Sequence, residues 1–450
     1  MSSNSTVLAE DFSPNQTNRR HFLRNFGVAG LALAGTGAGL VGCAKTNEST
    51  QKSASDPTAS ATQANTPQDS DPKANPKHAG SEASNAKNCF ADNQFEFYGE
   101  HQAGITTPSQ RHIYFLVMDL HTEDRQVIQQ MFKDWTQASL NLTQGKNIHA
   151  YSNNEFVPPT DTGEADNLGA YGLTLTFGVS RQFLTKLGLE DKLPKDFNDL
   201  PLFPRDQIRP EWSGGDICIQ ACSDDPQVAF HAVRQLVRQA RSNITMKWSQ
   251  AGFLGFDTGH ETPRNLFGFK DGTANQNTLK HADKNLWIDS PDWLQGGTYL
   301  VARKIQMHLE TWDRTSLKGQ EQTFGRHRDT GASIGKKAEF DEFDVHEKDA
   351  NGKPVVPEIS HMGLAKRTGI EMLRRSYSYS SGIDGKTGQF DAGLLFISFQ
   401  KSPMQFVAIQ SALGRVDKMN EYITHIGSGL FACFGGVKQG EYLGQKLFES

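Results

Sequence analysis

Cysteine is scarce in this sequence: 450 residues contain only five, and none of them belongs to a Cys-x-x-Cys-His motif. So few thiols exclude a disulfide framework, and the missing motif excludes the covalent attachment of c-type haem. The mean hydropathy is low, at −0.56, which excludes a polytopic membrane protein. Basic charge is not in excess either, because 46 basic and 51 acidic residues give a net charge of −5. Nothing in this balance favours a nucleic-acid-binding surface.

The N-terminal region has the pattern of an export signal. Arg19 and Arg20 precede a short, weakly apolar stretch, residues 26–41, that is rich in Gly and Ala. This arrangement predicts a twin-arginine signal within residues 1–43, since the stretch is too short and glycine-broken to span a membrane. The letters LVGC at residues 40–43 are similar to a lipobox, in which Cys43 is lipidated and anchors the protein to a membrane surface. The alternative is an ordinary signal cleaved near Ala44, and both alternatives predict a periplasmic or cell-envelope protein.

The rest of the chain divides by composition. Residues 44–90 contain almost no aliphatic or aromatic side chains, so they cannot offset their ordering entropy and are predicted to be a disordered linker. The remaining length is sufficient for two domains, at residues 91–255 and 256–450. In the first, apolar alternation and helical spacing predict the order strand, helix, strand, strand, helix, strand. This order is a split βαβ pattern.

The second part repeats the same theme. Strands are predicted at residues 297–307, 394–399 and 429–434, and helices at 309–312, 404–413 (with Gly414 at its end) and 418–426. Two similar halves predict an α+β fold made of duplicated ferredoxin-like domains with antiparallel sheets.

Three groups of residues are candidates for chemistry. His361 lies in a short segment after the charged loop 341–357, and histidines on loops are candidate ligands. Asp271 stands between glycines in GFKDGT, where a plain turn is the simpler interpretation. Arg374 and Arg375 precede alternating tyrosines and could be the solvated end of a strand.

Taken together, these segments carry a resemblance. The motifs GFKDGT, SHMGLAKR, LRRSYSYS, DAGLLFISF and NEYITHIGSGLFACFGG follow one another behind a twin-arginine signal. This order resembles the dye-decolourising peroxidases, and within them the exported deferrochelatase/peroxidase branch, over residues 93–436. The resemblance implies haem b, bound without covalent attachment in the C-terminal domain. One departure is residues 365–367, Ala-Lys-Arg, which stand where the family commonly has Asn-Pro.

The resemblance also implies roles for individual residues. His361 would be the axial ligand of the haem iron and would donate its other ring hydrogen to Asp417, with Glu421 and Asp391 as alternatives. Asp271 would take a proton from hydrogen peroxide and return it to the departing oxygen. Arg374 would stabilise the charge of that oxygen and hold a haem propionate. Adjacent strand residues face opposite sides, so periodicity alone leaves Arg374 and Arg375 as alternatives.

Other residues would line the haem. Gly272, Thr273 and Ala274 would lie against its edge, and Leu394 and Phe396 would pave the pocket on the peroxide side. Arg303 would either bind a propionate or be a solvated strand residue. Several aromatic residues would either relay electrons or belong to the core: Tyr377, Tyr379, Trp287, Trp293 and Trp312.

Three functions follow as hypotheses. The first is a haem peroxidase that uses hydrogen peroxide to oxidise bulky, phenolic or dye-like donors. The second is the release of iron from haem, as a deferrochelatase that works with iron-transport components. The third is a surface lipoprotein without enzymatic activity. A homodimer is a further expectation, and no nucleic-acid partner is expected.

Overall fold

The computed structural model describes residues 90–256 and 262–449, which belong to one compact unit. The predicted export signal, Cys43 and all but the last residue of the predicted linker lie outside the described residues. In the part of the chain that is described, no helix is long and apolar enough to cross a membrane.

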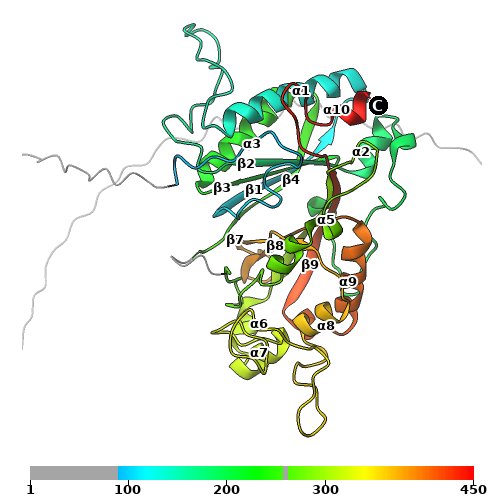
Figure 1. The fold of residues 1–450 in the computed structure, drawn as a ribbon. Helices are drawn as coiled ribbons and strands as arrows, with labels where there is room; N and C mark the ends of the chain where they lie inside the picture. The colour runs from blue at the N-terminus through cyan, green and yellow to red at the C-terminus, as the bar shows by residue number, and fades with distance from the viewer. Residues whose placement is uncertain (1–89, 257–261, 450) are drawn as a thin grey trace, which may run out of the picture. The chain divides into compact units, whose positions relative to one another are not determined.

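The N-terminal half contains four antiparallel strands in the order β2-β3-β1-β4. Helices α1 and α3 cover the outer face of this sheet (Figure 1). The strand and helix order predicted from the sequence is confirmed. The elements are β1 His112–Leu120, α1 Arg125–Leu142, β2 Thr174–Val179, α2 Arg181–Lys186, η1 Glu190–Lys192, η2 Pro210–Trp212, β3 Ile217–Ser223, α3 Pro226–Ala240 and β4 Ile244–Phe253.

The C-terminal half repeats this topology, with the order β9-β5-β8-β7 and the short strand β6 also paired with β8. The last helix, α10, returns to pack beside α1 of the N-terminal half (Figure 1). The elements are α4 Asn275–Lys280, α5 Ala282–Asn285, β5 Thr298–Met307, α6 Leu309–Asp313, α7 Leu317–Phe324, α8 His361–Arg367, β6 Leu373–Arg374, β7 Tyr377–Ile383, β8 Phe390–Gln400, α9 Pro403–Val416, η3 Lys418–Glu421, β9 Ile423–Cys433 and α10 Gln445–Glu449.

The two four-stranded sheets join at both edges. β2 pairs with β9 through Gly178 and Cys433, and β4 pairs with β7 through Phe253 and Ser378. With the β5–β8 pairing, eight strands therefore form a closed ring, which leaves none of their edges free to pair with another chain. The predicted α+β fold with two ferredoxin-like halves is confirmed.

Side-chain alternation along the strands sorts the core into three clusters. One fills the interior of the ring, a second packs the N-terminal sheet against α1 and α3, and a third lies under α6 and α7. β5 shows the alternation: Leu300 and Ala302 face the interior, whereas Ile305 belongs to the third cluster. The outer face of the C-terminal sheet therefore continues into the region that contains the candidate functional residues.

Two predictions for the last third of the chain were wrong. Residues 418–426 do not form one helix: η3 ends at Glu421, and β9 begins at Ile423, because from there the chain pairs with β5. The strand therefore starts well before the predicted Gly429. Gly414 does not end its helix either, since α9 continues to Val416. Strand pairing therefore decides the conformation of residues 423–426.

Closure of the C-terminal sheet depends on Gly393 in β8. A Cβ atom at this position would lie 1.9 Å from the carbonyl oxygen of Ile305 in β5 and 3.0 Å from the Tyr379 ring. We expect Gly393→Ala to lower the free energy of unfolding by at least about 2 kcal/mol, because a backbone atom cannot move aside. Gly385→Ala is the matched control, since a Cβ there has open space. Urea unfolding of both variants tests this, and equal stabilities would contradict it.

Lys304 is a cation inside the ring, almost fully buried. Its Nζ lies 3.5 Å from the centre of the Trp212 ring and 4.8 Å from that of Tyr379. Burial lowers the pKa of Lys304 to about 8, an effect that Asp391 opposes and Arg209 reinforces. An unfolded lysine has a pKa of about 10.4, so between these values only the unfolded state keeps the proton.

The stability of the protein should therefore rise with pH between about 8 and 10.4, by up to about 3 kcal/mol. Below pH 8 the full cost of the buried charge is present. Lys304→Met should remove this part of the pH dependence, and the difference between the two unfolding curves isolates it from other groups. Parallel curves across this range would show that the buried charge costs nothing.

Candidate functional site

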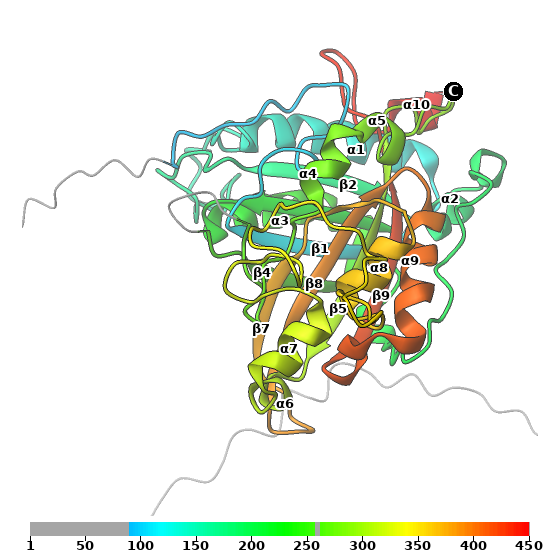
Figure 2. The same cartoon turned by 60° about the horizontal axis from the view of Figure 1, so that its bottom comes forward.

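Four segments that are distant in sequence form the candidate site. They are the turn before α4, which contains Asp271; the start of α8, with His361; strand β6, with Arg374; and the end of α9, with Asp417. Helices α8 and α9 lie side by side against the C-terminal sheet (Figure 2). His361, expected on a loop, is instead the first residue of α8.

His361 is held by a carboxylate. Its Nδ1 lies 2.7 Å from Oδ2 of Asp417, so Asp417 is the one of the three proposed carboxylates that the structure places in contact with it. The other oxygen of Asp417 accepts a hydrogen bond from the backbone N–H of Met419 at 2.9 Å. Both oxygens are thus engaged, which fixes the orientation of the carboxylate and leaves Nε2 of His361 as the ring nitrogen free to bind a ligand.

Small residues determine where α8 begins. Ser360, fully buried, precedes His361 and donates its hydroxyl hydrogen to the carbonyl of Pro357 at 2.7 Å. A Cβ at Gly325 or at Gly363 would lie 2.7 Å from the Ser360 oxygen. Because Gly325 and Gly363 have no side chains, the end of α7 and the first turn of α8 can pack around this serine. This packing positions the next residue, His361.

Asp271 and Arg374 form the second pair of the site. Nη1 of Arg374 donates to Oδ1 of Asp271 at 2.8 Å, and the side chains are 25% and 19% exposed. The turn that contains Asp271 is tied back by its N–H to the carbonyl of Pro263 at 2.8 Å. Gly272 follows with φ of +127°, a conformation that only glycine adopts readily, so the chain turns sharply into α4 after the carboxylate.

Two polar side chains hold this pair in place. The carboxamide of Asn275 accepts from the N–H of Arg374 at 3.0 Å and donates to its carbonyl at 2.6 Å, which joins the start of α4 to β6. Glu339 accepts hydrogen bonds from Lys270 and Thr273, both at 2.8 Å. Burial raises the pKa of Glu339, but these hydrogen bonds outweigh burial and the net pKa is lowered. Glu339 is therefore ionised, and it links Lys270 and Thr273, which lie on either side of Asp271 in the chain.

The two pairs act on each other. Burial lowers the pKa of His361, and the charge and hydrogen bond of Asp417 raise it above the ordinary value. Arg374 also lowers this pKa and Asp271 raises it, which places both groups within electrostatic range of the imidazole. The site thus combines an imidazole held by a carboxylate with an acid–arginine pair that acts on it electrostatically.

Apolar side chains lie around these pairs. Leu394 is buried and Phe396 half-buried, and both belong to the outer face of β8, as expected. The Phe324 ring lies 6.5 Å from His361 and stacks on Phe269 at 4.0 Å. Of the three residues expected at the haem edge, Gly272 and Thr273 are partly buried, whereas Ala274 is exposed at the start of α4.

The two neighbouring arginines have different surroundings. Arg374 faces Asp271, whereas Arg375 is buried and donates to the carbonyls of Thr107 and Pro108 at 2.5 and 3.1 Å.

Arg303 is not a solvated strand residue: it is buried and ion-paired with Asp206 at 2.5 Å. The five aromatic residues that would either relay electrons or belong to the core are all buried, as core residues are: Tyr377, Tyr379, Trp287, Trp293 and Trp312.

Sequence reasoning missed Arg326. Burial lowers the pKa of its guanidinium, and the neighbouring charge of Arg374 lowers it further, whereas Glu339 and Asp271 raise it. Its Nη1 donates to the carbonyl of Gly331 at 2.6 Å. Arg326 is thus a second cation beside the Asp271–Arg374 pair. No periodicity marks it, because it lies in an irregular segment after α7.

The donor set of this site suits a flat iron-containing ring bound through one histidine. One imidazole nitrogen is free, its partner carboxylate is fixed, and two arginines are available for acidic groups at the ring edge. Among residues 90–256 and 262–449, the site included, no group of three His, Cys, Asp or Glu side chains could hold a metal ion on its own. His361 would therefore bind the iron, and Arg374 and Arg326 the propionates.

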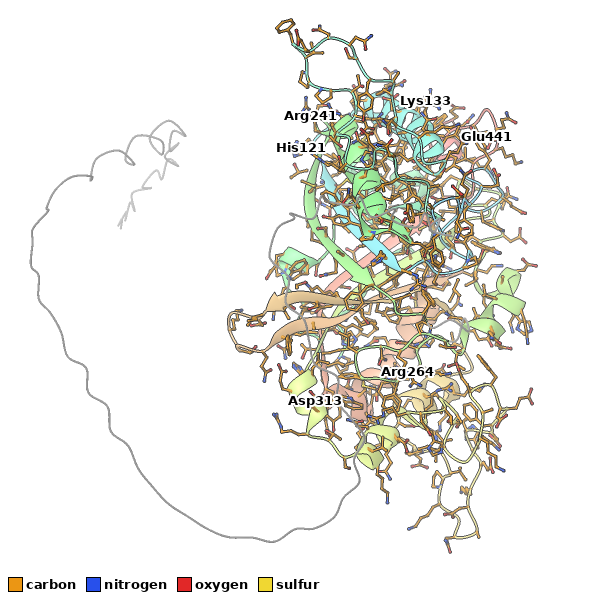
Figure 3. All side chains as sticks on the ribbon, turned by 90° about the vertical axis from the view of Figure 1, so that its left-hand side faces the viewer. His121, Lys133, Arg241, Arg264, Asp313 and Glu441 are labelled. Carbon is orange, nitrogen blue, oxygen red and sulfur yellow. The ribbon has the colours of Figure 1, made fainter. Side chains whose placement is uncertain are left out.

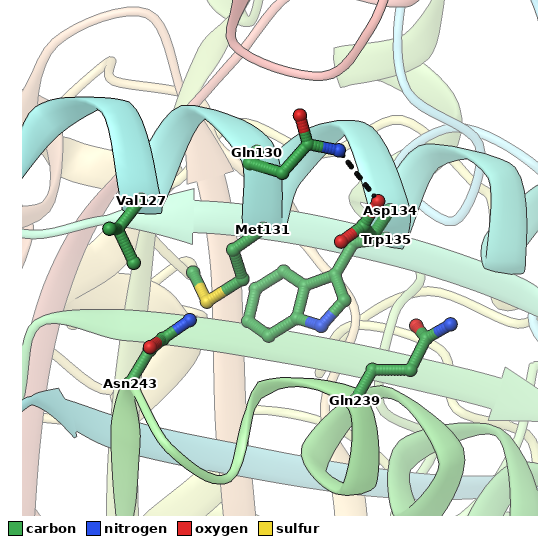
Figure 4. A pocket seen from close by; sticks show the side chains of 7 residues that line it. All are labelled: Val127, Gln130, Met131, Asp134, Trp135, Gln239 and Asn243. Carbon is green, nitrogen blue, oxygen red and sulfur yellow. Dashed lines mark hydrogen bonds between the residues drawn. The ribbon is translucent and has the colours of Figure 1, made fainter.

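Other surface features lie apart from this site. A cavity of about 210 Å³ lies between α1 and the α3–β4 connection, and Met131 and Trp135 point into it (Figure 4). Arg264 belongs to the turn before Asp271 and donates to the carbonyls of Gly268 and Asp329, both at 2.8 Å. Figure 3 shows Arg264 away from the end of the molecule where His121, Lys133, Arg241 and Glu441 are labelled.

Comparison with known proteins gives a consistent result. Residues 102–254 match the family model described as Dyp-type peroxidase, N-terminal, and residues 262–438 match Dyp-type peroxidase, C-terminal. Proteins named deferrochelatase from Escherichia coli strain K12 and Shigella boydii are 36% identical over 373 residues, which cover 78% of this chain and 86% of theirs.

Solved structures agree with these matches. A DyP-type peroxidase from Streptomyces coelicolor superposes with a TM-score of 0.75 at 34% identity, over 80% of this chain and 98% of that one. Ferric DtpA from Streptomyces lividans gives a TM-score of 0.74 at 35% identity, with the same coverage. A DyP-type peroxidase from Cellulomonas bogoriensis gives 0.74 at 35% identity, over 80% and 99% of the chains.

Proposed function

Because the chain belongs to the Dyp-type peroxidase family, as a haem-dependent peroxidase that uses haem b, we propose that it uses hydrogen peroxide to oxidise bulky phenolic or dye-like donors outside the cytoplasm. The observation that supports this proposal best is the pairing of His361 with Asp417 at 2.7 Å together with that of Arg374 with Asp271 at 2.8 Å. When bound, the haem supplies a redox-active iron that accepts peroxide and passes oxidising equivalents to a donor.

Each residue of the site has a defined task in this reaction. His361 would hold the iron through Nε2, and Asp417 accepts its Nδ1–H, which fixes the ring and would make it a stronger donor. Asp271 takes the proton from one oxygen of peroxide and delivers it to the other. Arg374 stabilises the negative charge that develops on the departing oxygen, and its contact with Asp271 keeps both groups at the same place.

The limited exposure of this pair bears on substrate size. Asp271 and Arg374 are each at least three-quarters shielded, with Leu394 and Phe396 on the neighbouring strand. This limited exposure favours access by a molecule as small as peroxide, whereas a dye would remain outside and give up electrons at a distance. The test is turnover of a phenolic donor and of a large dye by haem-loaded protein. Reaction of the protein with peroxide without oxidation of either donor would refute the proposal.

The relatives named deferrochelatase support a second candidate function, the release of iron from haem with the porphyrin intact. The same pocket would serve both activities. Anaerobic incubation of the protein with haem and a reductant, followed by fluorescence detection of metal-free protoporphyrin, separates them. Protoporphyrin formation that depends on His361 would favour this function, and its absence would leave the peroxidase reaction alone.

The proposed location depends on Arg19, Arg20 and Cys43. Replacing both arginines by lysine should keep the protein in the cytoplasm, because the twin-arginine pathway reads this pair. Cys43→Ser should instead release the exported protein from the membrane fraction if Cys43 is lipidated. Cell fractionation tests both, and export of the lysine variant would contradict the signal.

A further inference from the structure

A phenol and a thiol lie together inside the closed ring of strands. Tyr377 of β7 and Cys222 of β3 both have no exposed surface and belong to the cluster that fills the interior. The Tyr377 hydroxyl makes no hydrogen bond to a nitrogen or oxygen atom of the described residues, although buried phenols usually find such a partner. Its neighbour is the Cys222 thiol, and each group acts on the pKa of the other.

The strand register explains this contact. Cys222, Ile113 and Gly252 lie side by side on β3, β1 and β4, so Gly252 is about 10 Å from Cys222. A Cβ at Gly252 would lie 2.8 Å from the Cβ of Tyr377. Tyr377 therefore starts over Gly252, where no side chain opposes it, and from there its side chain is long enough to reach the Cys222 thiol, with which its hydroxyl interacts. The hydroxyl-bearing end of the ring thus meets Cys222.

Burial keeps the thiol of this pair neutral. Burial raises the pKa of Cys222, and Arg375 only partly opposes this effect. Burial also raises the pKa of Tyr377 well above its ordinary value. Both groups therefore keep their hydrogens until an oxidant removes them, and neither reacts as an anion.

The pair also lies directly behind the functional site. Tyr377 is paired with Leu395 in β8, and the two residues that flank Leu395, Leu394 and Phe396, face the site on the other side of the sheet. Arg374 is only three residues away along the chain. Oxidising equivalents that no external donor consumes therefore have a buried phenol and thiol as close neighbours.

From this geometry we infer a modification site: the peroxide reaction joins Cys222 to Tyr377 by a thioether bond. The inference rests on the peroxidase activity. The new bond joins Sγ of Cys222 to a ring carbon next to the Tyr377 hydroxyl, and the S–H and ring C–H bonds break. The pair loses two electrons and two protons, which reduce one hydrogen peroxide to two waters. The thioether covalently links the N-terminal half to the C-terminal half.

The structure supplies controls. Tyr379 is equally buried and its hydroxyl also lacks a partner among the described residues, but it contacts the Lys304 ammonium group. Cys218 and Cys433 are equally buried, and both sulfur atoms would lie 3.1 Å from a Cβ at Gly178. Tyr379→Phe and Cys218→Ser therefore preserve the inferred site, whereas Tyr377→Phe and Cys222→Ser remove it with little change of shape.

The experiment treats haem-loaded protein with a few equivalents of peroxide, without a donor, and measures intact mass and tryptic peptides. The wild type, Tyr379→Phe and Cys218→Ser should become lighter by two hydrogen atoms and yield one joined peptide, residues 206–234 linked to 376–386. Tyr377→Phe and Cys222→Ser should yield none. The linked wild type should also melt at a higher temperature, because its unfolded chain is constrained.

The experiment distinguishes failure of the peroxidase function from failure of the thioether inference. If the haem absorption does not respond to peroxide, the peroxidase function fails, and the inference fails with it. If the haem responds and peroxide is consumed, but peptides 206–234 and 376–386 stay separate in the wild type, the thioether is refuted while the peroxidase stands. A joined peptide that persists in Cys222→Ser would also overturn the assignment.

Discussion

Replacement of Asp271 by asparagine is expected to slow the reaction of the haem-loaded protein with hydrogen peroxide by about 10²- to 10⁴-fold. An asparagine has nearly the same shape but cannot accept and return a proton. The contact with Arg374 at 2.8 Å positions the carboxylate beside the guanidinium group. Stopped-flow measurement of the second-order rate constant checks this, with the haem absorption of each sample as the measure of loading.

Arg374→Leu should lower the same second-order rate constant by about 10²- to 10³-fold, because the charge that develops on the departing oxygen is no longer stabilised. Arg374→Lys should recover part of this loss through charge alone, since lysine lacks the planar fork. The double variant Asp271→Asn with Arg374→Leu should be only slightly slower than the slower single variant. Groups that act as a unit are strongly non-additive, and these two are in direct contact.

A second ion pair provides the control. Arg234 and Glu164 lie 3.1 Å apart in the N-terminal half, on α3 and the segment before β2, and neither belongs to the site. Arg234→Leu should leave the peroxide rate unchanged. A fully loaded Asp271→Asn protein that reacts at the wild-type rate would remove Asp271 from the mechanism, whatever its contacts.

Much of this site could be predicted from the sequence, because its residues lie in compact motifs. The motifs, through the family resemblance that they carry, predict His361, Asp271 and Arg374 as site residues, and the structure pairs His361 with Asp417 and Arg374 with Asp271. The choice between Arg374 and Arg375 needed the register of β6 on β8, which periodicity cannot provide. The two side chains leave the chain in opposite directions, one toward Asp271 and one toward residues 107–110.

What could not be predicted depends on contacts between distant segments. Arg326 and Glu339 lie in irregular chain between α7 and α8, where no repeat of apolar residues marks them. The closing of the two sheets into one ring rests on a few backbone pairs, such as Gly178 with Cys433. The sequence pattern predicts residues 423–426 as part of a helix, although Ile423, Thr424 and Ile426 are β-branched, and pairing with β5 fixes this segment as a strand.

Loss of haem is the result expected for His361→Ala, and it is the largest effect on the cofactor that the site allows. Asp417 holds Nδ1 of His361 at 2.7 Å and leaves Nε2 to bind the iron, so we expect haem binding to depend on this side chain. Asp417→Asn should retain haem with about 10- to 100-fold weaker binding or activity, because the imidazole keeps its position but loses the charge of its partner.

Titration of haem-free protein with haem, followed by absorption, measures both variants. His308→Gln is the matched control, since this histidine contacts Thr424 near the end of β5 and is outside the site. Added imidazole should restore part of the haem absorption to His361→Ala, because it fills the space of the missing ring and can bind the iron directly. If His361→Ala bound stoichiometric haem with the wild-type spectrum, another residue would be the iron ligand. The role assigned to Asp417 would then be refuted as well.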